Sequence, residues 1–254
     1  MQELFDWVEN NHIYTDSYSS ECKKLRVESI SIRKIPSSIT LLTKLSEISI
    51  SNSGLKVIPP EIGQLSNLTK IRFSTNEIRR IPSEIGNLSK LIALDLTNNY
   101  ISTIPAEIGK LSNLTQLHLY GNNINSLPDE IGQLTNLREF RVGSNRLSTL
   151  PASMSKLINL RMLSIAGNYL LIVPLMLGKL VEYGELHCVY LSCEDLKIAK
   201  EIDSADFCKF LYRLHIHLIV KKYYYRWRSI IINQRGPKDN HEVYILQTYL
   251  ATYT

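Results

Sequence analysis

The sequence predicts an α/β solenoid, in which each turn of one continuous coil contains a short strand and a helical or irregular return segment. A phrase of 23 residues recurs without a gap, and both its proline and its opening leucine keep that step over seven copies. Two registers that agree over seven copies indicate stacked structural repeats. The prolines are Pro36, Pro59, Pro82, Pro105, Pro128, Pro151 and Pro174, and the leucines are Leu42, Leu65, Leu88, Leu111, Leu134, Leu157 and Leu180.

We expect three regions along the chain. Residues 1–18 are predicted to form an N-terminal helical cap, because Leu4, Phe5 and Val8 share one face of a helix and an uncapped end repeat would expose its apolar edge. Residues 19–196 form the solenoid, with six full repeats over 42–179 and degenerate end repeats over 19–41 and 180–196. Residues 197–254 form a basic, tyrosine-rich C-terminal cap or tail.

Each repeat divides into a strand and a return segment. Ile71 and Phe73, two residues apart, mark a strand whose inward side chains fill the core. The later IPxEIGxL part is expected to form the convex return, where proline fixes φ and ends strand pairing. A glycine at positions 63, 86, 109, 132 and 178 is expected to permit a tight turn.

A column of asparagines recurs once per repeat and is predicted to be structural. An Asn amide both donates and accepts, so stacked side chains can satisfy the backbone groups of a buried turn. Ser53 and Ile30 interrupt the column, so we expect the N-terminal end to be held least tightly. The column consists of Asn76, Asn99, Asn122, Asn145 and Asn168.

Charge and cysteine content indicate in which cellular compartment the chain is expected. The formal net charge is +5, and residues 207–238 hold eight Lys or Arg and no Asp or Glu, which leaves about −3 for the rest. The N-terminus is acidic where a signal peptide would be basic, and no apolar run is long enough for a membrane span. With four cysteines and no cysteine-rich ends, the chain is expected to be cytoplasmic.

The sequence favours a protein that is not an enzyme. GxxxxGKS/T, GxGxxG, HExxH and GxSxG motifs do not occur. Cys188, Cys193 and Cys208 do not form the compact pairs of a zinc site, and cysteine commonly packs as a small hydrophobe. We therefore expect no catalytic residue, no metal and no cofactor.

The outward-facing strand positions are the part of the repeat that the fold leaves free. In a solenoid these side chains line the concave face, and in the central coils they are large, polar or aromatic. Interfaces are enriched in Arg and Tyr, so we expect this patch to bind another protein; an ordinary solvated face is the alternative. The same step carries the columns on to Glu185, His187 and Val189. The candidate site residues are Lys70, Arg72, Asp95, Gln116, His118, Tyr120, Glu139 and Arg141.

The basic tail contains KKYYYRWR at 221–228, for which three interpretations are open. The first is a helical cap with a solvated charged face. In the second, interleaved cations and aromatic rings contact nucleic acid or an anionic membrane. The third is a partner-binding or dimerising helix. The residues of this alternative site are Lys221, Lys222, Tyr225, Arg226, Trp227 and Arg228.

The unit LSKLIALDLTNNYISTIPAEIGK at 88–110 resembles the intracellular Ras-associated leucine-rich-repeat group. The resemblance covers 42–179 closely and 19–196 loosely, and no concave residue matches a family contact. It implies cytoplasmic scaffolding or signalling, with a small GTPase or a phosphatase as partner. The composition of the tail is also similar to that of proteins from large amoeba-infecting DNA viruses. We therefore expect a leucine-rich-repeat solenoid: a curved right-handed coil with a parallel concave sheet, short convex segments and helical caps.

Overall fold

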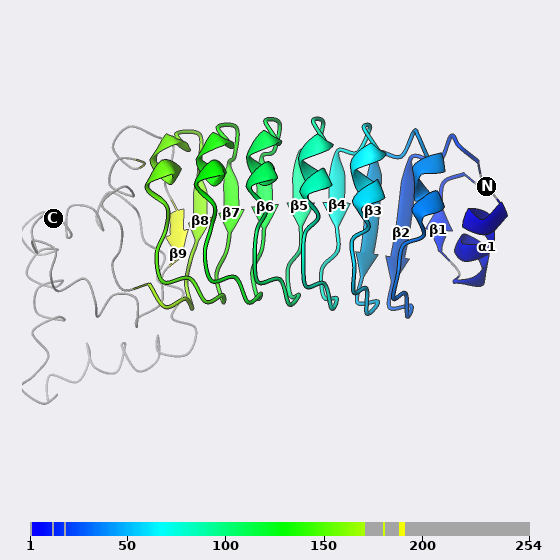
Figure 1. Ribbon diagram of the computed structural model, residues 1–254, viewed down its shortest axis with the longest axis horizontal. Helices are drawn as coiled ribbons and strands as arrows, with labels where there is room; N and C mark the ends of the chain where they lie inside the picture. The colour runs from blue at the N-terminus through cyan, green and yellow to red at the C-terminus, as the bar shows by residue number, and fades with distance from the viewer. Residues whose placement is uncertain (1, 12, 18, 171–179, 181–187, 191–254) are drawn as a thin grey trace, which may run out of the picture.

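The computed structural model describes residues 2–11, 13–17, 19–170, 180 and 188–190, and shows a leucine-rich-repeat solenoid. One nine-stranded sheet, with its strands in chain order, lies behind a row of 3₁₀ helices in Figure 1. The strands are β1 (Tyr14–Thr15), β2 (Lys24–Glu28), β3 (Glu47–Ser51), β4 (Lys70–Arg72), β5 (Ala93–Asp95), β6 (Gln116–His118), β7 (Glu139–Arg141), β8 (Met162–Ser164) and β9 (Cys188–Tyr190). The 3₁₀ helices are η1 (Ser37–Leu41), η2 (Pro60–Gln64), η3 (Ser83–Asn87), η4 (Ala106–Lys110), η5 (Asp129–Gln133) and η6 (Ala152–Lys156).

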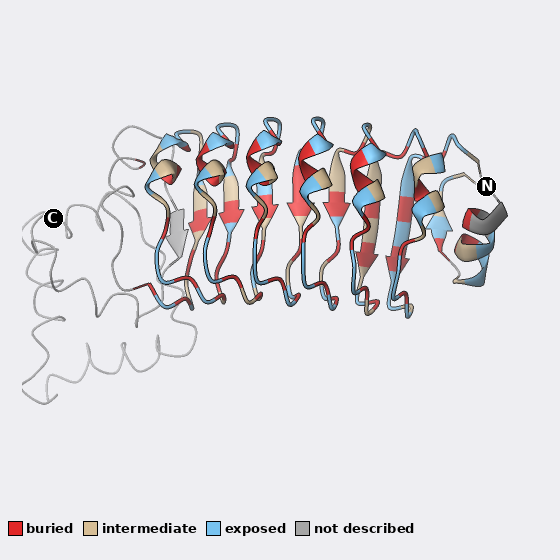
Figure 2. Cartoon of the chain, viewed as in Figure 1, coloured by how far each residue is buried: buried red, intermediate tan, exposed pale blue. Residues whose placement is uncertain are grey.

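The repeat sets the register of the sheet. From β2 to β8 each strand pairs in parallel with the next at the period of the repeat, as Ile48 does with Ile71 and Ile71 with Leu94. The predicted inward positions Ile71 and Phe73 are fully buried. The buried side chains form one core that runs along the array between the sheet and the 3₁₀ helices (Figure 2).

The expected register of the last strand is wrong. Ser164 of β8 pairs with Tyr190 of β9, and not with His187, the residue that the predicted step reaches. Leu163 correspondingly pairs with Val189, a residue that we had assigned to an outward column. The segment between β8 and β9 is therefore longer than in the other coils, which shifts the paired residues of β9 away from the expected positions.

The N-terminal end contains a feature that the repeat pattern does not indicate. Strand β1 pairs antiparallel with β2, the first strand of the parallel array. Burial raises the pKa of Asp16, but hydrogen bonds from the N–H groups of Lys24 and Lys23 outweigh it, so the pKa lies below its ordinary value. These bonds fix the corner between β1 and β2.

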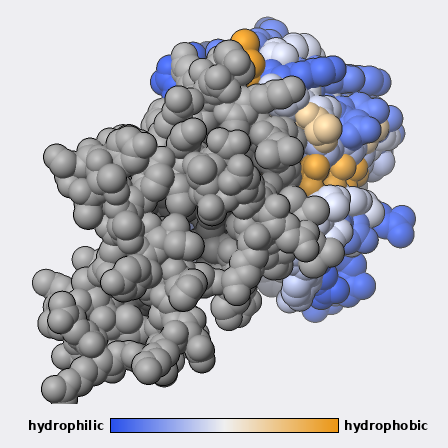
Figure 3. Space-filling view, turned by 90° about the vertical axis from the view of Figure 1, so that its left-hand side faces the viewer, coloured by the Kyte–Doolittle hydropathy of each residue, from blue (hydrophilic) through white to orange (hydrophobic). Residues whose placement is uncertain are grey.

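Helix α1 (Gln2–Asn10) lies at the same end of the array (Figure 1). Its Leu4 and Val8 are buried in the core, and Trp7 packs partly buried against it. The function of residues 1–18 as a cap stays a prediction. The C-terminal cap falls outside the described residues. Viewed from the β9 end, the described surface is mostly hydrophilic, with a small hydrophobic area beside the undescribed residues (Figure 3).

Proline and glycine act together at the 3₁₀ helices. Pro82 precedes η3 with φ −68° and ψ 147°, and its equivalents in the other coils have nearly the same angles, because the proline ring fixes φ. Strand β4 already ends at Arg72, so this proline marks the start of a 3₁₀ helix and does not end the strand. The reason that we gave for the glycines at 63, 86, 109 and 132 is wrong, and position 178 lies outside the described residues. A Cβ at Gly86 would lie 2.6 Å from the carbonyl oxygen of Glu107, and Gly63, Gly109 and Gly132 have equivalent contacts. Glycine at these positions allows neighbouring 3₁₀ helices to approach closely.

The predicted asparagine column bridges successive coils. Asn122 Oδ1 accepts from Ile101 N–H at 3.0 Å, and its Nδ2 donates to the carbonyl oxygens of Leu96 at 2.9 Å and Leu119 at 3.0 Å. The side chain is 7% exposed, so these backbone groups are satisfied away from water. The same bonds recur in the coils on either side.

A second asparagine column, which sequence reasoning missed, lies where the chain re-enters the sheet. Nδ2 of Asn113 donates to the carbonyl oxygen of Ser89 in the preceding coil at 2.7 Å. Asn67, Asn136 and Asn159 form the same bond at 2.8 Å. The recurrence of asparagine after the opening leucine was the signal that could have identified it.

A third column has left-handed backbone conformation. The residue directly before each position of the first asparagine column has a φ between 51° and 72°, in every coil from Ser29 to Gly167. Two of the seven are glycine, and one is the β-branched Thr75 at φ 55°. Because Cβ crowds the following carbonyl in this region, non-glycine residues here are strained. The turn after each strand requires this conformation whichever residue occupies it.

Replacing Asn122 by alanine should destabilise the fold by about 2 kcal/mol, because it leaves the N–H of Ile101 buried without a partner. The carbonyl oxygens of Leu96 and Leu119 each lose one of two bonds and keep the one from Asn99 or Asn145. Urea unfolding followed by circular dichroism measures the change. The adjacent Asn123→Ala is the matched control, since no side-chain hydrogen bond joins Asn123 to the described residues, and it should change stability by less than about 0.5 kcal/mol. Equal effects of the two substitutions would contradict the bridging role of the column.

Replacing Thr75 by glycine should stabilise the protein by about 1 kcal/mol, because relief of the left-handed strain exceeds the added entropy of the unfolded chain. Thr97→Gly, whose backbone is not in the left-handed region, should destabilise it by a similar amount. The shift in thermal midpoint reports both effects. A lower midpoint for Thr75→Gly would show that the strain is absent.

Candidate functional site

The predicted site residues lie together on the outer face of the sheet, which we call the strand face. It consists of the outward side chains of β2–β8 and of the second residue after each of the strands β4–β8, such as Tyr120. Arg72 pairs in register with Asp95, Gln116 with Glu139, and His118 with Arg141. The core-facing residues between them are buried. Parallel pairing at a constant step therefore places these side chains in two columns that cross the coils.

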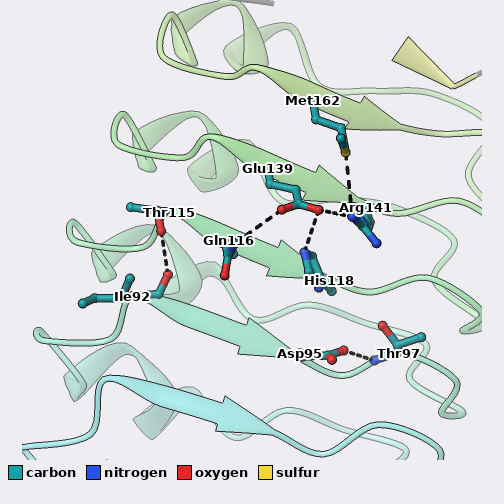
Figure 4. A network of polar contacts seen from close by, with 9 residues as sticks. All are labelled: Ile92, Asp95, Thr97, Thr115, Gln116, His118, Glu139, Arg141 and Met162. Carbon is teal, nitrogen blue, oxygen red and sulfur yellow. Dashed lines mark hydrogen bonds and ion pairs between the residues drawn. The ribbon is translucent and has the colours of Figure 1, made fainter. Parts of the chain in front are cut away.

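Glu139 is the centre of a polar network on β6, β7 and β8 (Figure 4). Its Oε1 forms an ion pair with Nη2 of Arg141 and lies 3.2 Å from Nε2 of His118. This second contact does not have the geometry of a hydrogen bond. Gln116 Nε2 lies 3.4 Å from Glu139 Oε2, which completes the contacts of the carboxylate.

Burial differs within the network. The side chains of Glu139 and His118 are 18% and 20% exposed, whereas that of Arg141 is 47% exposed. The carboxylate is thus held inside the surface, and the guanidinium reaches outward from it. Nη2 of Arg141 also lies 3.9 Å from Sδ of Met162, a weak contact that extends the network to β8.

The N-terminal half of the predicted patch is not part of this network. Nζ of Lys70 pairs with Oε1 of Glu47 at 3.4 Å. Asp95 Oδ1 accepts from Thr97 N–H at 3.0 Å, which turns that carboxylate toward its own strand (Figure 4). Arg72 is exposed and has no ion pair within the described part of the chain. The patch therefore consists of an ordered network over β6–β8 and a cation over β4 that is open to a partner.

Tyr120 lies beside the network, just beyond the end of β6 and directly after Leu119. Its side chain is exposed, at 43% of its area. A Cβ at Gly143 would lie 3.2 Å from Cδ2 of this ring and 2.9 Å from the carbonyl oxygen of Ala166. Gly143 thus leaves room for the tyrosine ring against the next coil. Sequence reasoning did not select Gly143 or Met162, although both occupy the outward columns that it described.

The described residues show neither a cluster of metal ligands nor a helix that could cross a membrane. No group of three or more His, Cys, Asp or Glu side chains among them could hold a metal ion. None of the helices that the structure describes is long and apolar enough to cross a bilayer. The alternative tail site at 221–228 lies outside the described residues.

Family models match most of the repeat array. A model described as "Leucine-rich repeat region" matches residues 107–222, and one described as "Leucine rich repeat" matches 43–101 and 82–124. Among curated proteins no sequence matches the chain.

Three solved structures with the same fold illustrate the likeness. The ectodomain of the Arabidopsis thaliana membrane receptor kinase GASSHO1/SCHENGEN3, in complex with CASPARIAN STRIP INTEGRITY FACTOR 2, is 33% identical over 63% of this chain, with a TM-score of 0.58. An internalin from Listeria monocytogenes is 25% identical over 67%, with a TM-score of 0.56. The plant peptide hormone receptor RGFR1, in complex with RGF2, is 25% identical over 67%, with a TM-score of 0.53.

This chain spans only 20%, 50% and 33% of these three structures, respectively. The likeness therefore concerns the repeat array and its geometry. The parallel coils of constant period, the asparagine column and the two family models lead to one assignment. The chain is a leucine-rich-repeat protein.

Proposed function

We propose that this chain is a non-catalytic binding module whose strand face over β4–β8 contacts a protein or peptide partner. The observation that carries the proposal is the network around Glu139, with Arg72 and Tyr120 beside it. These are the positions at which the coils differ from one another, whereas the buried positions repeat. Residues that the fold does not require are the ones available for recognition.

The geometry suits binding because part of the surface is already ordered. Glu139 contacts both Arg141 and His118, so these side chains lose less conformational freedom when a partner arrives. Arg72 offers a guanidinium that has no ion pair in the described structure, and Tyr120 offers an exposed ring. Arginine and tyrosine commonly supply the largest share of the binding energy at protein interfaces.

The structural neighbours support a partner of this class. Two of the three reported above were solved in complexes named for a bound factor or hormone. Because this chain spans a fifth and a third of those two structures, their own partners are not carried over to it.

The finer parts of the proposal rest on the sequence resemblance. A scaffold in intracellular signalling, a cytoplasmic location, and a small GTPase or phosphatase as partner stay predictions. Nucleic-acid or membrane contact through residues 221–228 also stays a prediction, because that segment lies outside the described residues.

Replacing Arg72, Tyr120 and Arg141 together by alanine should abolish binding of the partner, since it removes the outward cations and the ring while leaving the buried core intact. Affinity purification of the full chain from its native cells, followed by quantitative mass spectrometry, identifies the proteins that the wild type retains and the variant loses.

The matched control replaces Lys110, Asn125 and Lys156 by alanine. These three exposed side chains lie outside the strand face, and their replacement likewise removes two cations. It should retain every partner. Retention of the same proteins by the strand-face variant would place the binding surface elsewhere, provided that its circular dichroism matches the wild type.

A further inference from the structure

Five cations and one exposed valine gather on the side of the coil opposite the strand face. They occupy two adjacent positions in three consecutive coils, on the segments that lead from the turn after a strand to the next 3₁₀ helix (Figure 1). All six residues are exposed. We call them the basic patch: Arg33, Lys34, Lys56, Val57, Arg79 and Arg80.

Backbone contacts fix the members of the patch side by side. The N–H of Lys56 donates to the carbonyl oxygen of Arg33 at 3.3 Å, and Lys34 pairs with Val57 in a parallel bridge. Arg79 and Arg80 occupy the same two positions one repeat later. The cations therefore form a compact group on neighbouring coils of one rigid array.

The fold does not require these charges. In the next three coils the equivalent positions are 102, 103, 125, 126, 148 and 149, and they hold only exposed Ser, Thr and Asn residues. Neutral side chains thus serve the same backbone equally well. The cations are confined to the first three coils, where they raise the local positive potential.

Within the described structure, few of these cations form ion pairs. The one ion pair in the patch joins Lys56 to Glu77 at 3.5 Å, and both side chains are about half exposed. A pair this exposed contributes little and leaves both charges solvated. The other four cations have no ion pair within the described part of the chain.

We propose that the basic patch binds an anionic membrane surface. Exposed Lys and Arg are attracted to acidic headgroups, and each contributes additively without a specific pocket. Val57, with 57% of its area exposed among these cations, can enter the headgroup layer. The patch itself holds no aromatic side chain on which a base could stack, which favours a lipid surface over a single-stranded nucleic acid. The strand face would then point away from the membrane and stay open to a partner.

Co-sedimentation of the full chain with vesicles tests the proposal. Vesicles of phosphatidylcholine with about a third phosphatidylserine should retain the protein, vesicles of phosphatidylcholine alone should not, and added salt should release it. Replacing both Arg79 and Arg80 by glutamine should weaken the partition coefficient on the order of twentyfold, because each cation contributes about fivefold.

The control replaces Lys110 and Lys156 by glutamine, which removes the same charge from exposed positions on η4 and η6. This control should bind like the wild type. Equal losses in both variants would mean that net charge alone acts, and no loss in either would place membrane contact elsewhere, including the tail; both outcomes overturn the proposal. Displacement of the protein from vesicles by an equal charge of duplex DNA would identify a nucleic acid as the preferred partner and would also overturn it.

Discussion

The hydrogen bonds of the buried asparagine column are the constraint on which the rest of this structure depends. Each coil turns sharply after a very short strand in β4–β8, so the backbone groups of the turn have no ladder of their own. The amides of Asn76 through Asn168 satisfy those groups and at the same time join each coil to the one before it. Regular stacking of the sheet, of the core and of the strand face follows from that connection.

Because the coils stack at a constant step, the position of a residue within its repeat determines where its side chain lies on the surface. Residues that must be buried or must turn are repeated, and residues between them are free to vary. Two groups of free residues are chemically distinct: the network around Glu139 on the sheet side and the basic patch around Arg79 on the opposite side. They face different directions, so a partner protein and a charged surface could be held at once without competing for the same side chains.

Periodic residues made most of the fold predictable. The step of the prolines and leucines predicted the parallel register from β2 to β8, and Asn122 behaves as the column of asparagines indicated. Features that occur only once were not predictable, because there is no second copy with which to compare them. Strand β1 and the shift in register at β9 are examples. The left-handed column was hidden for another reason, since Ser, Thr, Asn and Gly all occupy it.

The candidate site was predictable in membership but not in internal contacts. Alternation along a strand shows that Gln116, His118, Glu139 and Arg141 face outward. Which of them pair depends on rotamers and on burial of the carboxylate, and these follow from the neighbouring coils. That Lys70 pairs with Glu47, and not with the network, likewise required the structure.

The glycines of the 3₁₀ helices have a consequence for shape. A coil that is wider on its helix side than on its sheet side is a wedge, and a stack of wedges is an arc. By letting one helix contact the carbonyl oxygen of the next, Gly63, Gly86, Gly109 and Gly132 keep the coils narrow on that side, whereas η6 has Ser155 at the same position. A larger residue at any of these four positions would push neighbouring coils apart on the helix side alone. Such a change would alter the separation between side chains such as Arg72 and Arg141 that a partner must span.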